Sequence, residues 1–581
     1  MPEQPVIIIY DATGILAPAP GWRRFIDAVD IVQAATLVEV PGALERVERY
    51  TQAGFTASGF VCYEASAAFD AALQTHVPGP LPLLWFGIFR TVETITLPPV
   101  TEFHTSPWQA SVTRAEYQAA FARIKEYIAQ GDSYQVNYTW RLRADFTGDP
   151  WGLFHALYQA QRPCYGAYLD IGAHVLCSAS PELFFTRHGE VITCRPMKGT
   201  IERGLWYQQD QRNAALLLAS EKERAENLMI VDMVRNDLGR IAMPGQVAVP
   251  RLFTAEQYDT LWQLTSSVTA HSSATLPALF RALFPCASIT GAPKIRTSQI
   301  ITELETTPRG VYTGCIGFVA PGGDAQFNVA IRTAHLARRT GRVEYGVGSG
   351  VTWDSTCTGE YQECRTKALL LSAHRPAFQL LETLLWKPEI GYFLLQRHLQ
   401  RLGESARYFG IPLESGVVEA KLQAYTATFP AQRQRVRCLI DANGNCTLEA
   451  QPIAPAPVLR WRLALAPAPI DPGERLLYHK TTWRVPYEQA RAASPEADDV
   501  LLWNPVGELT ESTIANVVVR SGGRLLTPPV HCGLLAGTYR DHLIASGRIV
   551  EEVISVDELS PDTEIYLLNS VRGWVPAKIV R

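Results

Sequence analysis

A proline that directly follows a helical run divides this chain of 581 residues into two parts. The helical pattern of Thr366–Ala373 ends before His374-Arg375-Pro376, and a strand pattern begins at Phe378–Leu385. The residue before a proline disfavours the helical conformation, so a helix usually ends there. A single hydrophobic core rarely extends over so long a chain. We therefore expect two units, one over residues 1–375 and one over 376–581.

Within the first unit, strand-like runs alternate with helical ones. Tyr165–Val175 and Gly314–Val319 have the apolar content of buried strands, whereas Arg114–Gln130 and Gln211–Leu238 have the period of helices. This mixture indicates an α/β or α+β fold for the first unit.

The second unit contains two proline-rich stretches between Pro452 and Pro469. Proline-rich segments are extended and stiff, so they commonly separate folded parts of a chain. The pattern therefore predicts a connector between two subdomains, which would occupy residues 376–455 and 470–581.

Composition narrows the class of function. With 47% hydrophobic residues and a formal charge of -4, the chain is globular and has no broad basic surface for nucleic acid or an anionic membrane. The eleven cysteines form no Cys-x-x-Cys pair, which favours a reducing, cytoplasmic environment over disulfides or a zinc site. The apolar run Val6–Tyr10 lacks a basic segment before it, so we expect a buried strand and no signal peptide or membrane span.

Two acidic helices mark the first candidate site. Glu223 and Glu226 are three residues apart, as are Glu360 and Glu363, so each pair shares one face of a helix. Two such helices facing each other would present four carboxylates, which are the hard oxygen ligands that Mg²⁺ prefers. Glutamate pairs at this spacing also occur on ordinary solvated faces, so the spacing alone leaves both interpretations open.

Three further segments could bind an anion. Ser288–Lys294 places a hydroxyl, a glycine and a cation before a helix, and helix N-termini attract anions. Gly346–Gly350 permits close approach of the backbone, and Arg332 is a charge within a strand-like run, where it needs a partner. Glycine runs are also plain turns, and a strand arginine is also a surface residue, so no segment decides alone.

Together these segments resemble the chorismate-utilising enzymes over residues 110–372. The matching segments, in the order of that family, are Ser180-Pro181-Glu182, Pro196-Met197-Lys198-Gly199-Thr200, Arg224–Asn227, Asp232–Asp237, Ser288–Lys294 and Ile331-Arg332-Thr333. The resemblance implies an α/β sandwich of antiparallel sheets with flanking helices that binds chorismate. It further implies Mg²⁺ held by Glu226 and Glu363, with Glu223 and Glu360 in support.

The resemblance also implies which residues hold the two carboxylates of the substrate. Lys367 falls where a cation of the family faces the ring carboxylate. The residues that fall where the family binds the pyruvyl carboxylate are Tyr312, Arg332, Gly348 and Gly350. Thr290 and Gly291, in the Ser288–Lys294 turn, complete the predicted substrate site.

Lys198 selects a branch of the family. The anthranilate and isochorismate relatives carry a small residue at this position, whereas a lysine resembles the aminodeoxychorismate synthases. Its amine could attack the ring as the C4 hydroxyl leaves, which would give a covalent adduct that ammonia resolves at C4. Glu182 is the candidate general acid for that hydroxyl. A cation that only holds a carboxylate is the alternative role for Lys198.

One position departs from the family pattern. Many relatives carry histidine where this chain has Gln263, and an amide cannot transfer a proton at neutral pH, so more of the acid role would fall to Glu182. The sequence shows no Gly-x-Cys-x-Gly elbow of a glutaminase, because Gly314-Cys315-Ile316-Gly317 has the wrong spacing. We therefore expect ammonia to come from a separate glutamine amidotransferase subunit.

Lys480 marks the second candidate site. It follows the apolar residues Leu476-Leu477 and Tyr478, so we expect it to project from a strand into a partly desolvated cleft. Desolvation lowers the pKa of a lysine and favours its covalent reaction with a carbonyl group. Taken alone, the pattern also fits a surface lysine on an edge strand.

The surroundings of Lys480 resemble the fold type IV pyridoxal phosphate enzymes over residues 378–581. The matching segments are Gln396–Leu402, Gly507–Asn516, Leu526–Pro529 and Leu535–Arg540. The resemblance implies that Lys480 binds the cofactor covalently and that Glu511 pairs with its pyridine nitrogen, which keeps the ring an electron sink. It implies that Arg401 and Thr538 hold the phosphate, in a two-subdomain fold that commonly forms homodimers.

Two segments, Phe378–Leu384 and Tyr566–Gly573, look most like the aminodeoxychorismate lyases within that family. Such a lyase would bind the C4 amine of its substrate and use Lys480 to remove the C4 proton while pyruvate leaves from C3. Arg572 is a candidate for holding a substrate carboxylate.

The two resemblances together predict a bifunctional enzyme that makes 4-aminobenzoate for folate biosynthesis. The first unit would aminate chorismate to 4-amino-4-deoxychorismate, and the second would eliminate pyruvate from it. Two alternatives stay open at this point. One is an anthranilate-type synthase joined to an amino-acid transaminase, against which Lys198 counts. The other is a non-catalytic chorismate-binding or partner-binding module that delivers to the lyase.

Overall fold

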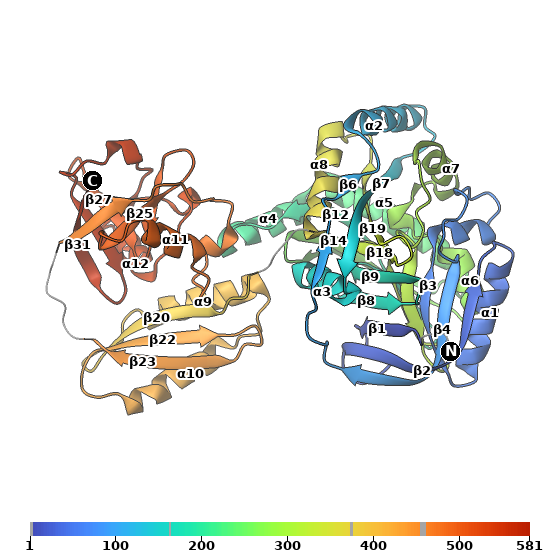
Figure 1. Ribbon diagram of the computed structural model, residues 1–581, viewed down its shortest axis with the longest axis horizontal. Coiled ribbons are helices and arrows are strands. Elements are labelled where there is room, and N and C mark those ends of the chain that lie inside the picture. Colours follow the sequence, from blue (N-terminus) through green and yellow to red (C-terminus); the bar gives the residue numbers. More distant parts are fainter. Residues whose placement is uncertain (1–3, 162–163, 372–375, 454–459, 581) are drawn as a thin grey trace. The chain divides into compact units, whose positions relative to one another are not determined.

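The computed structural model describes residues 4–161, 164–371, 376–453 and 460–580. The chain forms two compact units, whose ribbons are shown in Figure 1. Unit 1 consists of Met1–Glu202 and Ala214–Arg375, and unit 2 consists of Arg203–Asn213 and Pro376–Arg581. Arg203–Asn213 thus belong to unit 2 although they lie within the sequence of unit 1. No sequence pattern predicted this exchange.

Unit 1 is built on antiparallel strands. Its strands are β1 (Val6–Asp11), β2 (Gly21–Ala34), β3 (Thr56–Val61), β4 (Leu84–Ile95), β5 (Phe103–Thr105), β6 (Gln109–Ala110), β7 (Gln135–Gly148), β8 (Tyr165–Asp170), β9 (His174–Ser180), β10 (Leu183–His188), β11 (Val191–Arg195), β12 (Met197–Glu202), β13 (Val247–Gln257), β14 (Leu261–His271), β15 (Gly291–Ala292), β16 (Cys315–Val319), β17 (Ala325–Val329), β18 (Thr333–Ala337) and β19 (Arg342–Val351). The longest ladders join β2 to β4 and β7 to β19. They form the frame on which the site residues are placed.

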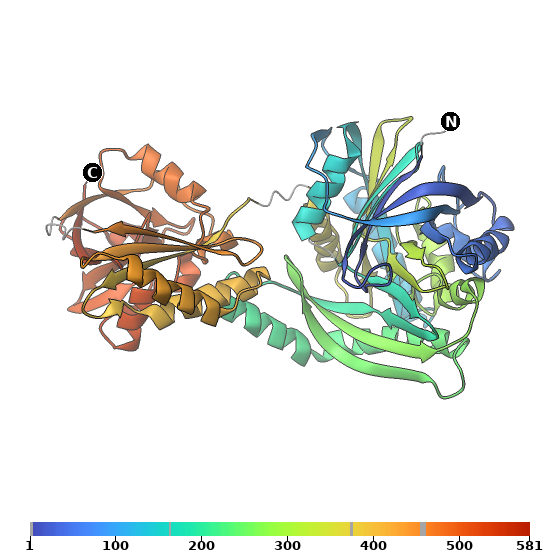
Figure 2. The same ribbon diagram turned by 90° about the horizontal axis from the view of Figure 1, so that it is seen from below.

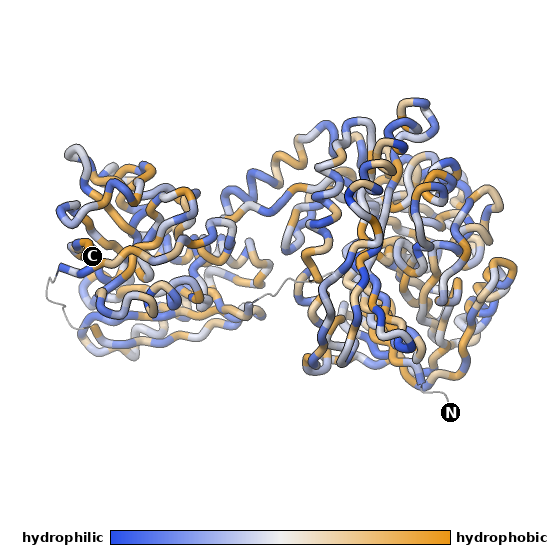
Figure 3. The backbone as a smooth tube through the Cα atoms, turned by 45° about the horizontal axis from the view of Figure 1, so that its top comes forward, coloured by the Kyte–Doolittle hydropathy of each residue, from blue (hydrophilic) through white to orange (hydrophobic). Residues whose placement is uncertain are grey.

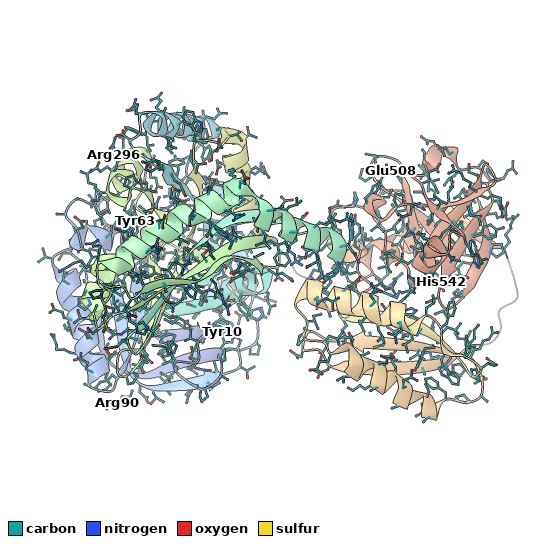
Figure 4. All side chains as sticks on the ribbon, turned by 180° about the vertical axis from the view of Figure 1, so that it is seen from behind. Tyr10, Tyr63, Arg90, Arg296, Glu508 and His542 are labelled. Carbon is teal, nitrogen blue, oxygen red and sulfur yellow. The ribbon has the colours of Figure 1, made fainter. Side chains whose placement is uncertain are left out.

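Helices flank these strands. The helices of unit 1 are α1 (Glu39–Gln52), α2 (Arg114–Ala129), α3 (Pro150–Gln161), α5 (Glu221–Gly239), α6 (Leu276–Leu283), α7 (Lys294–Leu304) and α8 (Cys357–Ala368), with short 3₁₀ turns η1 (Tyr63–Ala68), η2 (Ala287–Ile289) and η3 (Leu369–Leu371). Helix α4 (Tyr207–Ala219) begins in unit 2 and ends in unit 1. Helix α1 packs beside α6, as Figure 1 shows, and α5 lies across β14 (Figure 4).

The core of unit 1 is apolar and aromatic, and orange, apolar stretches follow its strands in Figure 3. Phe184 and Phe185 of β10 pack against Phe280 of α6 and Phe327 of β17, with ring centroids 5.1 to 6.4 Å apart. Aromatic packing of this kind fixes the positions of the elements that carry the rings. Strand β10 begins next to Glu182, so this cluster also locates that carboxyl.

One predicted helix is divided in the structure. The sequence pattern indicated a single helix over Gln211–Leu238, but α4 ends at Ala219 and α5 begins at Glu221. The residue between them, Ser220, has an extended backbone, and its hydroxyl accepts a hydrogen bond from the Glu223 amide at 3.3 Å. A serine in this role satisfies an unpaired amide of the first helical turn, and so it starts a new helix.

The first part of unit 2 is a small sheet covered by helices. Strands β20 (Leu380–Lys387), β21 (Gly391–Tyr392), β22 (Gln434–Ile440) and β23 (Cys446–Pro452) pair in the order β21-β20-β22-β23. Figure 2 shows α9 (Leu395–Phe409) and α10 (Ser415–Tyr425) on one face of this sheet, and a common apolar cluster joins them to it. The turn η4 (Thr426–Thr428) follows α10. The other face of the sheet is thus left for the cavity described below.

The second part of unit 2 is a mixed eight-stranded sheet. Its strands are β24 (Trp461–Leu465), β25 (Asp499–Trp503), β26 (Leu509–Ser512), β27 (Asn516–Ser521), β28 (Arg524–Thr527), β29 (Val550–Glu551), β30 (Ile565–Asn569) and β31 (Gly573–Ile579), in the order β26-β25-β24-β31-β30-β27-β28-β29. The remaining elements are α11 (Val485–Ala493), α12 (Thr538–Ala545), η5 (Arg475–Leu477), η6 (Val530–Cys532) and η7 (Val556–Glu558).

The predicted connector between Pro452 and Pro469 is partly wrong. Strand β24 lies inside it and pairs in parallel with both β25 and β31, so this stretch is the interior of a sheet. The two neighbouring strands satisfy the backbone of β24, and proline neighbours do not prevent this. Residues 454–459 of the predicted connector lie outside the described residues.

None of the helices in the described part of the chain is long and apolar enough to cross a membrane.

Candidate active sites

Unit 1 contains a cavity of about 530 Å³ that collects most of the residues predicted for its site. Strand β12, helices α5 and α8, and strand β19 contribute to its walls. The predicted residues that line it are Glu182, Lys198, Glu223, Glu226, Tyr312, Arg332, Gly348, Gly350, Glu360, Glu363 and Lys367. Segments that are far apart in the sequence therefore meet around one space.

Thr290 and Gly291 are not part of this lining. The Thr290 hydroxyl is turned toward the backbone, where it donates to the carbonyl of Cys286 at 3.0 Å. Gly291 pairs with Val136 in the short ladder between β15 and β7. Their neighbours Ser288 and Ile289 line the cavity instead. The turn thus contributes to the wall of the cavity, but through residues other than the two that were predicted.

Lys198 projects from β12 into a confined place. Its ammonium donates to Oδ1 of Asn137 at 3.2 Å. A Cβ atom added to Gly350 would lie 2.8 Å from the Lys198 nitrogen, so a side chain there would have to displace the ammonium group. Burial lowers the pKa of Lys198 and Lys367 lowers it further, while Glu226 acts in the opposite direction. The balance increases the fraction of neutral, nucleophilic amine.

Glu182 is a buried carboxyl in the same cavity, only 2% exposed. The hydroxyl of Ser288 donates to its Oε1 at 2.5 Å. Burial raises the pKa of Glu182 to about 7, although Ser288 and Lys198 lower it. A carboxyl with this pKa is protonated at mildly acidic and neutral pH, as a general acid must be.

The two acidic pairs lie on α5 and α8, as their spacing predicts, and both helices line the cavity. Burial raises the pKa of Glu223 and of Glu226. Burial alone would also raise the pKa of Glu363, but Lys367 holds it below its usual range. Glu360 accepts a hydrogen bond from Ser355 at 2.6 Å through one oxygen, and its other oxygen is buried without a hydrogen-bond partner in the described residues.

These carboxylates fit a shared cation better than a closed metal site. The described residues contain no group of three or more His, Cys, Asp or Glu side chains placed to hold a metal ion. The raised pKa values of Glu223 and Glu226, and the unpartnered oxygen of Glu360, nevertheless show that nearby positive charge does not fully compensate these carboxylates. Mg²⁺ commonly completes its coordination with water and an anionic ligand, so a closed protein site is not required.

Lys367 and Arg332 supply positive charge to the same cavity. The Lys367 ammonium lies 2.6 Å from Oε1 of Glu363 and donates to the carbonyl of Gly348 at 2.8 Å. Arg332 donates to the carbonyl of Lys367 at 2.9 Å. The sequence predicted Arg332 inside a strand, but the residue lies at the junction before β18, with a φ of 53°. The left-handed backbone at this junction re-aims its side chain toward α8.

Gln263, the departure from the family pattern, has a structural role in this site. Its amide nitrogen donates to the carbonyl of Gly199 at 2.9 Å, and its oxygen accepts from Thr200 at 3.1 Å. Both partners belong to β12 and follow Lys198 directly. Gln263 therefore holds the strand that presents the lysine.

Three residues of the site were missed from the sequence. Asn137 and Ser288 contact Lys198 and Glu182, and Gln135 lies beside them, since a Cβ on Gly350 would be 2.5 Å from its amide nitrogen. Gln135 is fully buried, and neither its amide nitrogen nor its oxygen has a hydrogen-bond partner in the described residues. For Asn137 and Gln135 the only available signal was a polar residue within a strand, whereas Ser288 stood in the turn Ser288–Lys294 that the sequence indicated as a whole.

Unit 2 contains a second cavity, of about 860 Å³. The predicted residues that line it are Arg401, Lys480, Glu511, Thr538 and Arg572. It lies between the open face of the small sheet, through β20 and β22, and the eight-stranded sheet, through β26, β30, β31 and the adjoining loops. All five residues predicted for the second site thus share one space.

Lys480 does not project from a strand, contrary to the prediction. It follows η5 and precedes Thr481, which forms a single bridge with Leu380 of β20. The carbonyl of Lys480 accepts a hydrogen bond from the Leu381 amide at 2.9 Å. Burial lowers the pKa of Lys480 to about 8, and Arg401 contributes to the lowering. The expected desolvation is therefore present in a different local structure.

Glu511 is the buried carboxyl of the second cavity. It accepts hydrogen bonds from the Tyr487 hydroxyl at 2.8 Å and from the Leu535 amide at 3.3 Å. Burial raises the pKa of Glu511 to about 7. No basic side chain in the described residues forms an ion pair with it. A protonated ring nitrogen would supply the missing positive charge.

Arg401 is aimed by an acidic partner. Its guanidinium makes two hydrogen bonds to Glu382, at 2.8 and 2.6 Å, and a third to the carbonyl of Ala536 at 3.1 Å. Burial alone would raise the pKa of Glu382, but Arg401 and His398 hold it at about 2. Thr538 is the first residue of α12, so the positive end of that helix opens beside Arg401. This combination suits a phosphate group.

A row of arginines, which the sequence reasoning also missed, lines the second cavity. Arg433, Arg435 and Arg437 alternate at and just before β22, so they share one face of the sheet. Arg437 pairs with Glu449 of β23 at 2.8 Å. Together with Arg572 they make this wall of the cavity positively charged.

Comparison with known proteins identifies both units. Residues 92–372 match the family described as chorismate binding enzyme, and residues 379–580 match amino-transferase class IV. Over 330 residues the chain is 37% identical to aminodeoxychorismate synthase component 1 of Bacillus subtilis (strain 168), an alignment that covers 54% of this chain and 69% of that protein. The chain belongs to the chorismate binding enzyme family. The predicted combination of a chorismate-binding domain with a class IV aminotransferase domain is confirmed.

Two further comparisons concern the chorismate-binding domain. It is 42% identical over 261 residues to aminodeoxychorismate synthase component 1 of Escherichia coli (strain K12), covering 45% of this chain. The chain spans only 57% of the length of that relative. Anthranilate synthase component I from Streptococcus pneumoniae TIGR4 aligns with a TM-score of 0.52 at 23% identity, over 64% of this chain and 93% of that one. At this identity the likeness concerns the fold, and it confirms the predicted class for the chorismate-binding domain.

Proposed function

We propose that this chain makes 4-aminobenzoate from chorismate in two steps, one in each unit. The observation that carries the proposal is common to both cavities. Each holds one half-buried lysine whose pKa is lowered and one buried carboxyl whose pKa is raised to about 7. Shifted pairs of this kind are typical of acid–base and nucleophilic catalysis.

In unit 1, Lys198 and Glu182 divide the work of replacing the C4 hydroxyl of chorismate. The neutral amine of Lys198 attacks the ring as the C4 hydroxyl leaves, and Glu182 gives that hydroxyl a proton, so it departs as water. Ammonia then adds at C4 and displaces the lysine. The net change is chorismate plus ammonia to 4-amino-4-deoxychorismate plus water.

The charges around this cavity support a substrate with two carboxylates. Lys367 and Arg332 supply positive charge on one side, and the carboxylates of α5 and α8 could hold Mg²⁺ on the other. Glu226 and Glu363 would bind the ion, with Glu223 and Glu360 in support. A dianion and a divalent cation together would neutralise the lining.

In unit 2, the residues suit pyridoxal phosphate. Lys480 would bind the cofactor covalently, Glu511 would pair with its ring nitrogen, and Arg401 with the start of α12 would hold its phosphate. When bound, the cofactor supplies an electron sink. Once the substrate amine has displaced Lys480 from the cofactor, the free Lys480 amine would remove the C4 proton of the substrate. The enolpyruvyl group would leave from C3 and take up a proton on carbon to become pyruvate, which would yield 4-aminobenzoate.

The arginine row explains how this unit would hold its substrate. 4-Amino-4-deoxychorismate carries two carboxylates, whereas 4-aminobenzoate carries one. Arg435, Arg437 and Arg572 line the cavity and can make charge-assisted hydrogen bonds to such groups. We propose that they bind the substrate carboxylates and that loss of pyruvate loosens this hold.

Ammonia for the first step would come from a separate glutamine amidotransferase. The E. coli and B. subtilis relatives are named as component 1 of their synthases, which implies a further component. All eleven cysteines of this chain are free thiols, which suits the reducing cytoplasm, where folate precursors would be made.

The decisive experiment supplies the purified chain with chorismate, Mg²⁺, pyridoxal phosphate and an ammonium salt, and follows products by chromatography. We expect 4-aminobenzoate and pyruvate in equal amounts. Anthranilate in place of 4-aminobenzoate, again with pyruvate, would show an anthranilate-type synthase. Turnover only of supplied 4-amino-4-deoxychorismate would show that unit 1 is a binding module.

Two variants separate the steps. Lys198→Ala should lose the consumption of chorismate and keep the conversion of supplied 4-amino-4-deoxychorismate. Lys480→Ala should accumulate that compound and lose the visible absorbance of the bound cofactor. Lys125→Ala, a surface lysine that donates to the carbonyl of Thr352, is the control and should leave both steps intact. Full chorismate amination by Lys198→Ala would remove the lysine from the mechanism.

A further inference from the structure

The segment Arg203–Asn213 is packed into unit 2 by buried polar contacts. Arg203 and Asp210 form a double hydrogen bond, at 2.6 and 2.9 Å, and their side chains are 5% and 0% exposed. The Gly204 amide also donates to Asp210, at 3.0 Å. A buried ion pair with a matched set of hydrogen bonds fixes the conformation of the segment.

The segment is joined to α9 through Tyr408. Arg203 donates to the Tyr408 carbonyl at 2.8 Å, and its guanidinium lies 4.3 Å from the centre of the Tyr408 ring. The Tyr408 hydroxyl donates to the carbonyl of Gly204, also at 2.8 Å. A Cβ on Gly204 would lie 2.1 Å from the Asp210 amide nitrogen, so the approach requires glycine.

The same contacts reach the two residues before Lys480. Trp206 stacks on Tyr478, with ring centroids 5.4 Å apart and planes at 28°. His479 lies against the Tyr408 ring, at a centroid distance of 4.3 Å. Burial lowers the pKa of His479 to about 3, and the backbone of Leu205 acts in the opposite direction, so the imidazole is neutral. Both neighbours of the lysine on its N-terminal side are therefore held by this segment or by the tyrosine bound to it.

Lys480 is thus fixed between two supports. On one side, β20 holds its carbonyl and the following residue, through Leu381 and the bridge from Leu380 to Thr481. On the other side, the segment Arg203–Asn213 holds Tyr478 and His479. Removing either support would let the backbone that carries the lysine move relative to the cavity.

We propose that Arg203–Asn213 position Lys480, so that a stretch of sequence between the strand of Lys198 and the helix of Glu223 is a working part of the second active site. The inference rests on the proposed lyase function for the role of Lys480. Trp206 and Arg203 are positioning residues, because they act through Tyr478 and through the pairing of Tyr408 with His479. They do not themselves line the cavity.

The test uses the full-length chain with Trp206→Ala, and Trp206→Phe as the conservative variant that keeps an aromatic face. Three quantities are measured. They are kcat and KM on supplied 4-amino-4-deoxychorismate, the pH midpoint of the bound cofactor's visible absorbance, and amide hydrogen exchange of residues 476–484 in cofactor-free protein. Gln211→Ala, an exposed position of the same segment, is the matched control.

For Trp206→Ala we expect kcat to fall by about ten- to a hundredfold with KM little changed, because a small misplacement of a reacting group is costly. The absorbance midpoint should shift and exchange at 476–484 should rise, while Trp206→Phe restores all three. Unchanged kcat, midpoint and exchange in Trp206→Ala would overturn the inference.

Two controls keep the outcome decisive. Trp206→Leu retains apolar volume without the stacked ring, so the same three measurements apply to it if Trp206→Ala does not fold. A wild-type chain that cannot convert 4-amino-4-deoxychorismate would refute the lyase function alone. The absorbance midpoint and the hydrogen exchange would then still report whether the segment positions Lys480.

Discussion

The hydrogen bond from Ser288 to Glu182 sets the proton affinity of the proposed acid in unit 1. It stabilises the charged carboxylate and so lowers a pKa that burial has raised to about 7. In Ser288→Ala the pKa of Glu182 should therefore rise. The limb of the pH profile that Glu182 sets should therefore move to higher pH, by about one unit or more.

The measurement is the pH profile of kcat/KM for chorismate with ammonium ion as the nitrogen source. The other limb, which Lys198 sets, should move less. Ser272→Ala removes another buried serine, whose hydroxyl donates to the Ile241 carbonyl, and should leave both limbs in place. A profile with both limbs fixed in Ser288→Ala would mean that another group is the acid.

In the second cavity, Arg435 is predicted to bind a substrate carboxylate. Arg435→Gln should raise KM for 4-amino-4-deoxychorismate by about ten- to a hundredfold, the value of one charge-assisted hydrogen bond. Its effect on cofactor absorbance should be small, since Arg401 is retained. Arg462→Gln, on the exposed side of β24, is the control. An unchanged KM would remove the arginine row from substrate binding.

Residues in contiguous motifs could be predicted from the sequence, whereas residues defined by contacts across the fold could not. Lys198, Glu182 and the four glutamates stand in recognisable segments and reach one cavity. The hydrogen bond from Ser288 to Glu182, by contrast, joins residues 106 positions apart in the sequence. Gln135 is a single polar residue in a strand, and only its closeness to Gly350 in the folded chain shows that it belongs beside the site.

Among the elements, the break between α4 and α5 depends on Ser220. Ser220→Ala removes the acceptor for the Glu223 amide and should lower the free energy of unfolding of unit 1 by about 1 kcal/mol, whereas Ser220→Gly should cost only a few tenths. Urea denaturation followed by circular dichroism measures the difference. Equal stability of Ser220→Ala and wild type would show that tertiary packing alone starts α5.

The same element shows where periodicity fails as a guide. The polar and apolar pattern runs through Ser220 without interruption, so it predicted one helix where the chain forms two. Strand β24 was concealed by its proline neighbours, and Lys480 was assigned to a strand because apolar residues precede it. At β24 and Lys480, tertiary contacts outweighed the local pattern, whereas at Ser220 a local capping hydrogen bond did so.

At the scale of the whole molecule, buried carboxyls make stability depend on pH in opposite directions. The pKa of Glu511 is about 7 in the folded chain and 4.5 in its ordinary state. The folded state therefore binds more protons between these values. This stabilisation is fully present below pH 4.5 and is lost as the pH rises through 7. Glu382, held at about 2, contributes stability that is lost as the pH falls from 4.5 towards 2.

Glu511→Gln should abolish the first of these effects. Without cofactor, unit 2 of the wild type should lose on the order of 3 kcal/mol between pH 4.5 and 7, and the variant should lose much less. Hydrogen exchange of peptides from unit 2 in increasing urea, at several pH values, measures the free energy of unfolding of this unit. Glu552→Gln, an exposed carboxylate paired with Arg524, should keep the wild-type slope. A wild-type slope in Glu511→Gln would contradict the assignment.

At this scale the sequence predicted two units but not how the chain is shared between them. The proline at Pro376 was a local signal, and the chain does divide there. Arg203–Asn213 contain no proline, and their partners Tyr408 and Tyr478 are about two hundred or more positions away. Such an exchange follows from packing between distant residues, which no local pattern records.

Because of this exchange, the chain passes from one unit to the other after Glu202, after Asn213 and after Arg375. A gene that began at the last of these junctions would encode a class IV aminotransferase domain without Arg203–Asn213. End-to-end joining of two ancestral genes is therefore only the first event in the history of such a fusion. Because the second unit includes residues encoded inside the first, a gene for residues 376–581 alone would have to replace what Arg203–Asn213 provide.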